Sequence, residues 1–180
     1  MKNLLKRQVK GFTIIEVLIV LAIAGLILTI VFIAVPQLQR NTRDSKRQSI
    51  ASRLSTELQA YASNNGGSFP FATTAATYPG TNCKTSVATQ FACYDWYNRY
   101  INGKVDIKDP RTGTDGELYA STAIGVPTAQ WAATRTIIGP GKLCDGEAFK
   151  NGSNAGATAK DFAILIGLER TDTWYCVDNG

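Results

Sequence analysis

The sequence predicts an α+β protein in which one long N-terminal helix is followed by, and packs on, an antiparallel sheet. Three observations lead to this prediction. A long apolar run begins at Phe12, and an apolar stripe at helical spacing follows between Ile50 and Tyr61. Beyond residue 115 the chain contains short strand-like segments separated by turns. One helix that precedes several closely spaced strands is typical of an α+β fold.

The apolar run covers residues 12–35 and contains one ionisable side chain, Glu16. As a helix it would be about 36 Å long, which is enough to cross a bilayer. A helix is expected because it satisfies its own backbone hydrogen bonds in lipid. A carboxylate in such a segment costs about 3 kcal/mol or more near the bilayer centre, and less towards one end. Glu16 is therefore expected to have a partner.

The segment before this run is short and basic, and it ends at Gly11. Cleavage after Gly11 would create a new amine on Phe12, four residues before Glu16. Residues four apart lie on the same face of a helix, so opposite charges at these positions can meet.

The basic leader, Gly11, the sequence Phe12-Thr13-Ile14-Ile15-Glu16 and the long apolar helix together resemble the N-terminus of a type IV pilin or pseudopilin precursor. The resemblance covers residues 6–35. It implies that a prepilin peptidase cuts after Gly11 and methylates the new N-terminus, Phe12. It also implies that Glu16 neutralises the Phe12 amine of an adjacent subunit, because a charge that is costly alone in lipid becomes tolerable when paired.

The function implied by this resemblance is that of a structural subunit, not an enzyme, that polymerises through its N-terminal helix into a type IV pilus or pilus-like filament. The implied partners are copies of the chain, a prepilin peptidase, an assembly platform with its ATPase, and membrane lipid before assembly. The precursor is expected to cross the membrane once, with its head outside the cytoplasm, and to reach a cell-surface filament. Two alternatives stay open: a pseudopilin of a secretion or DNA-uptake system, and a monomeric membrane-anchored extracellular binding module.

We divide the chain into a leader (1–11), a transmembrane or filament-core helix (12–35), a stem helix that packs on the head (36–65) and a globular α+β head (66–180).

An ordinary secretory signal does not fit the N-terminus, because such a signal has a shorter apolar run and ends at a small-residue cleavage site. A plain signal anchor leaves Gly11 and Glu16 unexplained.

The stem begins with a polar stretch that includes the basic residues between Arg40 and Arg47. We interpret this stretch as a solvated face, with anionic lipid headgroups or acidic patches of neighbouring subunits as alternative contacts. The apolar stripe that follows should pack on the core of the head; it consists of Ile50, Leu54, Leu58 and Tyr61. The sequence Asn64-Asn65-Gly66-Gly67 predicts the end of the helix.

Composition excludes several classes of partner and of active site for the head. The net charge of +5 falls to +1 without the four basic residues of the leader, so nucleic acid is not an expected partner. The chain has no histidine, which excludes His-based catalytic triads and His-containing metal sites. No cofactor is expected.

Four cysteines in a chain with an export-type segment indicate two disulfides, and three pairings are possible. We choose Cys83–Cys93 with Cys144–Cys176. The first closes a short loop in the poorly periodic segment 68–115, and the second pins the last strand of the chain.

The remaining segments are predicted from local pattern. Segment 68–115 reads as a long loop with a short helical or extended piece near 91–100, and 150–160 as a flexible loop. Strands are expected at 117–124 and 131–138, followed by a hairpin of 161–169 with 173–177. The acidic residues Asp106, Asp109, Asp115 and Glu117 read as a solvated turn, since their spacing does not match an EF-hand. Asp109, Asp115 and Glu117 are weak calcium candidates, because some secretion pseudopilins bind calcium in a loop of this character.

Overall fold

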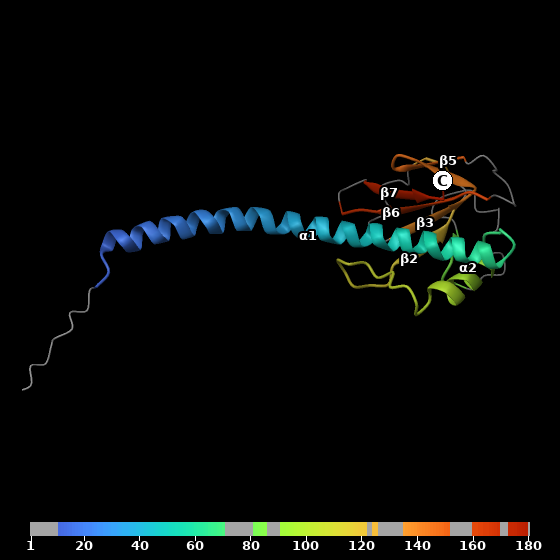
Figure 1. Ribbon diagram of the computed structural model, residues 1–180, viewed down its shortest axis with the longest axis horizontal. Coiled ribbons are helices and arrows are strands. Elements are labelled where there is room, and N and C mark those ends of the chain that lie inside the picture. Colours follow the sequence, from blue (N-terminus) through green and yellow to red (C-terminus); the bar gives the residue numbers. More distant parts are fainter. Residues whose placement is uncertain are drawn as a thin grey trace, which may run out of the picture. The chain divides into compact units, whose positions relative to one another are not determined.

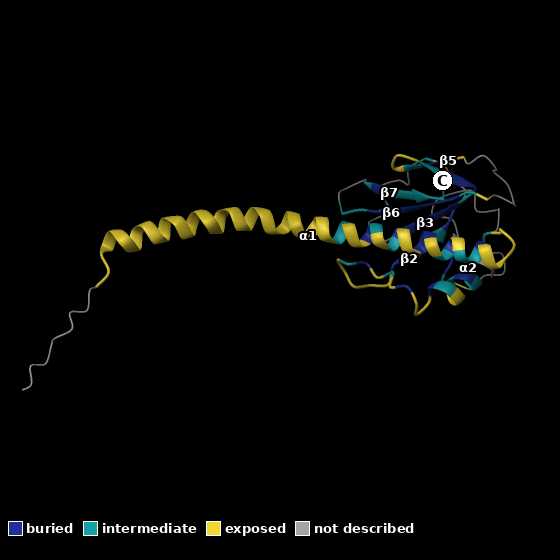
Figure 2. Cartoon of the chain, viewed as in Figure 1, coloured by how far each residue is buried: buried dark blue, intermediate teal, exposed yellow. Residues whose placement is uncertain are grey.

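The computed structural model describes residues 11–70, 81–85, 91–121, 124–125, 135–151, 160–169 and 173–179. The chain divides into two compact units, Met1–Arg40 and Asn41–Gly180. Every described residue of the first unit is exposed, whereas the second unit contains a buried core (Figure 2).

Helix α1 spans Ile14–Asn64 (Figure 1). Two glycines with positive φ, Gly66 at 65° and Gly67 at 83°, follow its last turn. The Gly67 N–H donates to the Ala62 carbonyl at 2.8 Å, which satisfies one of the free carbonyls at the helix end. Residues other than glycine adopt such φ values only at an energetic cost, so these two glycines end the helix. The predicted helix end is confirmed.

The sheet of the second unit has the strand order β1-β2-β3-β6-β7. Its strands are β1 (Thr81–Asn82), β2 (Glu117–Ala120), β3 (Arg135–Pro140), β6 (Phe162–Gly167) and β7 (Trp174–Asp178). All neighbours are antiparallel except β2 and β3, which are parallel. The predicted α+β class is therefore confirmed, with one pairing that differs from the expected antiparallel pattern. The connection from Ala120 to Arg135 is long enough for the crossover that a parallel pair requires.

The sheet carries a different layer on each face, because successive side chains of a strand point to opposite sides. One face packs on α1 through a cluster that includes Leu54, Leu58, Ile138, Ile164 and Ile166. The opposite face packs on a separate two-stranded hairpin of β4 (Lys142–Asp145) and β5 (Ala148–Asn151). The cluster on that face includes Ile137, Ala163, Leu165, Trp174 and, from β5, Phe149. Figure 1 shows α1 and the hairpin separated by the sheet.

The apolar stripe predicted for α1 is confirmed as its core-facing side, since Leu54 and Leu58 are fully buried while Ile50 and Tyr61 pack partly buried against the same cluster. The piece near 91–100 is helical. It consists of α2 (Phe91–Trp96) and a π-helical turn, η1 (Tyr97–Ile101), which bury Trp96 and Ile101 in this cluster.

Several predicted boundaries differ from the structure. The strand predicted over 117–124 ends at Ala120, and β3 continues through Gly139 and Pro140 instead of stopping at Ile138. Pro140 is tolerated because it lies beyond Ile138, the last residue of β3 that pairs with β2, so within the described residues β3 has an unpaired edge there. The predicted flexible loop 150–160 begins inside β5, and most of it, like residues 131–134 of the predicted strand 131–138, lies outside the described residues.

Candidate functional site

The predicted cleavage site lies in non-helical backbone immediately before α1. Gly11 is exposed, and a Cβ added to it would meet no atom within 4 Å. The Phe12 side chain is 88% exposed. Neither residue is packed against the part of the chain that the structure describes, so from that side the bond between Gly11 and Phe12 is open to an approaching enzyme.

Glu16 forms a reciprocal cap with Thr13 at the start of α1. The Thr13 backbone N–H and the Thr13 hydroxyl each donate to Glu16 Oε2 at 2.8 Å. In return, the Glu16 N–H donates to Thr13 Oγ1 at 3.4 Å. This is the capping box, in which the first and fourth residues of a helix start satisfy each other's backbone donors. This role of Thr13 was not predicted, although the Thr-x-x-Glu spacing is the signature of a capping box.

The cap engages one oxygen of the Glu16 carboxylate. Within the part of the chain that the structure describes, Glu16 Oε1 accepts no hydrogen bond. The carboxylate can therefore retain its cap and still accept a cation from elsewhere.

The first half of α1 has a continuous apolar surface. Every large apolar side chain from Phe12 to Val35 is at least 41% exposed. Among the described residues α1 is the one helix long and apolar enough to cross a membrane, with a window of mean hydropathy 3.2. A soluble monomer rarely exposes so large an apolar surface. This segment therefore requires lipid or other protein around it.

A second constellation of charges lies in the unit Asn41–Gly180, where Arg47 of α1 is buried. Its guanidinium donates to Asp109 Oδ2 from Nη2 at 2.6 Å and from Nε at 3.1 Å, and to Asp44 Oδ1 from Nη1 at 3.1 Å. The side chains of Arg47 and Asp109 are each 2% exposed. Glu169 Oε1 lies 3.7 Å from Arg47 Nη2, so three carboxylates surround one buried cation.

Arg43 and Asp44 connect the same cluster to the loop between β6 and β7. The Arg43 guanidinium forms a two-pronged contact with the Glu169 carboxylate, with Nη2 donating to Oε2 at 2.8 Å. The Glu169 N–H donates to Asp44 Oδ1 at 2.8 Å. This planar pairing is the geometry that gives arginine–carboxylate contacts their strength and direction. We call the set of Arg43, Asp44, Arg47, Asp109 and Glu169 the stem network.

Both buried carboxyls of the stem network are held ionised. Burial by itself raises the pKa of Asp109, but hydrogen bonds from Arg47 and from the Thr112 and Arg111 backbone outweigh it and leave the pKa below the ordinary value. The hydrogen bond from Arg43 lowers the pKa of Glu169. At neutral pH Asp109 and Glu169 are thus charged partners of Arg47 and Arg43.

The stem network corrects two interpretations made from the sequence. Arg43 and Arg47 do not belong to a solvated face, because both are paired within the chain. Asp109 is not part of a solvated turn, because it is buried against Arg47. One signal was available: the spacing of Arg47, Ala51, Leu54 and Leu58 places Arg47 on the buried stripe of the helix.

The three calcium candidates are not brought together. Each pairs with a different cation: Asp109 with Arg47, Asp115 with Lys84 at 3.5 Å, and Glu117 with Arg135. Across the described ranges, no group of three or more Cys, Asp or Glu residues is placed to hold a metal ion.

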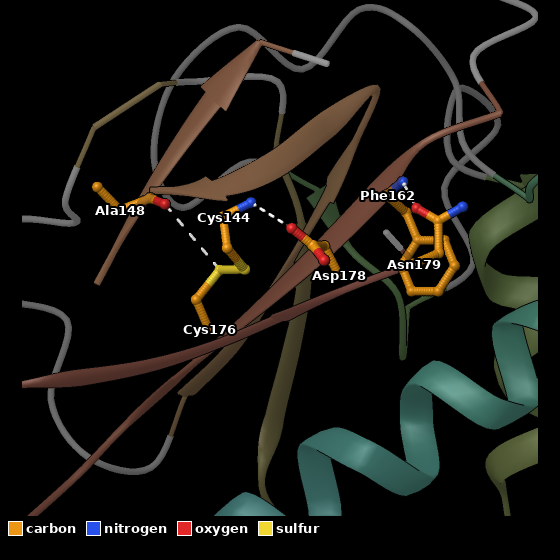
Figure 3. The surroundings of a disulfide bond; sticks show 6 residues. All are labelled: Cys144, Ala148, Phe162, Cys176, Asp178 and Asn179. Atoms are coloured by element: carbon orange, nitrogen blue, oxygen red, sulfur yellow. Dashed lines mark hydrogen bonds between the residues drawn. A yellow bond between two sulfur atoms is a disulfide. The ribbon is translucent and has the colours of Figure 1, made fainter. Parts of the chain in front are cut away.

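The disulfides of the structure join Cys83 to Cys93 and Cys144 to Cys176, the pairs chosen from the sequence. The first lies in the main core, with both cysteines buried. The second joins β4 to β7 across a Cα–Cα distance of 5.8 Å (Figure 3). Beside it the Cys144 N–H donates to Asp178 Oδ2 at 2.7 Å. The hairpin is therefore fastened to the last strand by a covalent bond and a charged hydrogen bond.

Comparison with known families gives one result at the N-terminus. A family model described as the prokaryotic N-terminal methylation motif matches residues 6–32, which include Gly11, Phe12 and Glu16. Comparisons with curated proteins and with solved structures found no match.

Proposed function

Since the chain carries the N-terminal methylation motif of the type IV pilin and pseudopilin family, we propose that it is the structural subunit of a type IV pilus or pilus-like filament. The motif implies processing by a prepilin peptidase and handling by an assembly machinery. In the proposed pathway the precursor is anchored in the membrane, cut after Gly11, methylated on Phe12 and polymerised through its N-terminal helix. Assembly then proceeds on a membrane platform driven by an ATPase.

The observation that carries this proposal is the uncovered apolar surface of residues 12–35, most of which lies within the methylation motif at residues 6–32. Lipid covers such a surface before assembly, and the same helices of neighbouring copies can cover it in a filament. In the division we propose, residues 1–11 are the leader, 12–35 the filament core, 36–65 the stem and 66–180 the head.

Glu16 gives the proposed assembly its selectivity. A carboxylate in lipid is costly, and pairing with the Phe12 amine of an adjacent subunit lowers that cost. The geometry supports this role, because the Thr13 cap occupies Oε2 and leaves Oε1 for an incoming amine. A subunit with the correct axial stagger therefore supplies the missing charge.

The proposal is tested on the protein purified from the membrane and from sheared filaments. We expect mass spectrometry to find Phe12, carrying one methyl group, as the N-terminus of the filament form, and electron microscopy to find filaments that disappear on deletion of the gene. An N-terminus at Met1 in all fractions, or a processed protein that stays monomeric in the membrane, would contradict the proposal. The second outcome would favour an anchored binding module.

A further inference from the structure

A basic groove lies between α1 and the segment that follows η1. It has a volume of about 420 Å³, and Lys46, Arg53 and Lys108 lie along it. All three side chains are exposed, and none forms an ion pair with another described residue. Of the two carboxylates in the lining, Asp109 is already committed to Arg47. The groove therefore carries an excess of positive charge.

An acidic tip lies at the turn of the β4–β5 hairpin. Asp145 and Glu147 are exposed there, on either side of Gly146, which has a φ of 62°. Neither carboxylate takes part in an ion pair with any residue for which the structure gives a position. The tight turn and the Cys144–Cys176 disulfide hold the tip in place, so little conformational freedom is lost when it binds.

The groove and the tip cannot meet within one copy. The groove is formed beside α1, which packs on one face of the sheet, whereas the hairpin packs on the other face. Figure 1 shows the sheet between α1 and the β4–β5 hairpin. Two complementary surfaces that face away from each other on one molecule generate a head-to-tail contact between copies, which continues from one copy to the next unless it closes into a ring.

We propose that the acidic tip of one copy, Asp145 and Glu147, binds in the basic groove of the next copy, against Lys46, Arg53 and Lys108. This inference rests on the proposed filament function and adds a contact between the globular units of neighbouring copies to the packing of the N-terminal helices. The contact selects the register of neighbouring heads, because a shifted copy places like charges together.

The lining of the groove favours a small acidic protein surface over a lipid surface or a nucleic acid. The lining also contains Asp106 and the partly buried apolar residues Ile50 and Pro110. A uniformly anionic polymer would meet the Asp106 carboxylate, whereas a tip with two carboxylates can place them on the cations and its turn on the apolar residues. The same chain provides that tip at a matching concentration.

Charge reversal in two sets of full-length variants tests the contact. The groove variant carries Lys46→Glu and Arg53→Glu, and the tip variant carries Asp145→Lys and Glu147→Lys. Each should lower the yield of sheared filaments about tenfold at an unchanged level of membrane precursor, because each copy then presents like charges to the next. Lys160→Glu, which reverses an exposed cation outside both surfaces, should leave the yield unchanged.

Co-expression of the groove variant with the tip variant tests most directly whether the two surfaces bind each other. In an alternating filament every reversed groove meets a reversed tip and every natural groove meets a natural tip, so the yield should recover although each variant fails alone. The combined variant with all four substitutions should recover as well. Normal yield of either single-surface variant, or loss without recovery on co-expression, would overturn the contact.

If a variant does not accumulate, the salt dependence of wild-type filaments tests the same contact. Their head contacts should loosen as ionic strength rises, seen as faster proteolysis of the β4–β5 turn, because exposed charges are screened. Proteolysis independent of salt would overturn the contact. If filament yield falls in Glu16→Val but not in the charge-reversal variants, the proposed function stands and only this inference is wrong. If the wild-type chain forms no filaments, both are wrong.

Discussion

Arg47 Nη2 lies 2.6 Å from Asp109 Oδ2, and both side chains are almost completely shielded from water. The two residues are 62 positions apart in the sequence. Their contact holds the chain that follows η1 against α1, and Glu169 adds the loop after β6 to the same cation. The position of the helix against the head thus depends on charges as well as on apolar packing.

Replacing Arg47 by methionine should destabilise the head by about 3 to 5 kcal/mol, because Asp109 is left buried without its counter-charge. Arg53→Met, an exposed position on the same helix, should change stability by less than about 0.5 kcal/mol. Denaturant unfolding of the detergent-solubilised protein, followed by tryptophan fluorescence, measures both. Adding Asp109→Asn to Arg47→Met should recover part of the loss. Equal stability of Arg47→Met and Arg53→Met would show that Asp109 does not need Arg47 as its counter-charge.

The stem network should make the head sensitive to acid. The pKa values of Asp109 and Glu169 are lower in the folded than in the unfolded chain, so the unfolded chain binds more protons as the pH falls. Their contribution is complete above about pH 5 and is lost as the pH falls through about 4 towards the folded values. As the pH is lowered from about 5 to about 4, Tm should fall more steeply for wild type than for Asp109→Asn. Parallel curves would contradict the assignment.

Glu16→Val should leave membrane insertion intact or improve it, since it removes a charge from lipid. Filament yield should nevertheless fall strongly, because the incoming Phe12 amine has no counter-charge. Thr13→Val removes the hydroxyl of the cap but leaves the carboxylate, so its effect on assembly should be smaller. Immunoblots of membrane and sheared fractions separate insertion from assembly. Wild-type filament levels for Glu16→Val would exclude the pairing role.

The two disulfides should differ in what they protect. Their sequence separations of 10 and 32 residues correspond to about 3 and about 4 kcal/mol in the chain-entropy model. Removing Cys144 and Cys176 together, as alanines, should speed hydrogen exchange in β7 and lower filament yield more than the matched removal of Cys83 and Cys93. Unchanged exchange in β7 would contradict this order, and non-reducing peptide mapping checks the pairing itself.

Gly139→Ala should destabilise the head by about 1 to 3 kcal/mol, the range for overpacking a dense interior. A Cβ at this position would lie 2.8 Å from Lys142 Cγ and 2.9 Å from the Phe149 ring. Gly25→Ala is the control, because a Cβ there meets nothing within 4 Å. Thermal unfolding of the two variants gives the comparison. An unchanged Tm for Gly139→Ala would mean that the β4–β5 hairpin shifts freely over the sheet.

Local pattern predicted the elements whose boundaries are decided by nearby residues. The end of α1 follows from two consecutive glycines, and the β6–β7 hairpin from two apolar runs around a short polar turn. The Glu16 cap was encoded just as locally, by Thr13 three positions earlier.

The missed features depend on residues far apart in the chain. Nothing near Arg47 specifies that Asp109 and Glu169 will meet it, and the parallel pairing of β2 with β3 is a choice among sheet topologies. The β4–β5 hairpin is different, because its mixed polar strands gave no clear alternation. Its turn residues, Gly146 and Glu147, were nevertheless a recognisable signal for a two-residue hairpin turn, because glycine at the first turn position adopts the positive φ that such a turn needs.

The place of β6 in the sheet sets the order in which the head can be completed. All six residues of β6 are buried, and the strand lies between β3 and β7. A chain made from its N-terminus onward exposes α1, β2 and β3 before this central strand exists. Cys83 and Cys93 can pair in that interval, whereas Cys144 must wait for Cys176. Oxidation of the first bond should therefore precede closure of the sheet, and a chain interrupted before residue 162 has no route to the native head.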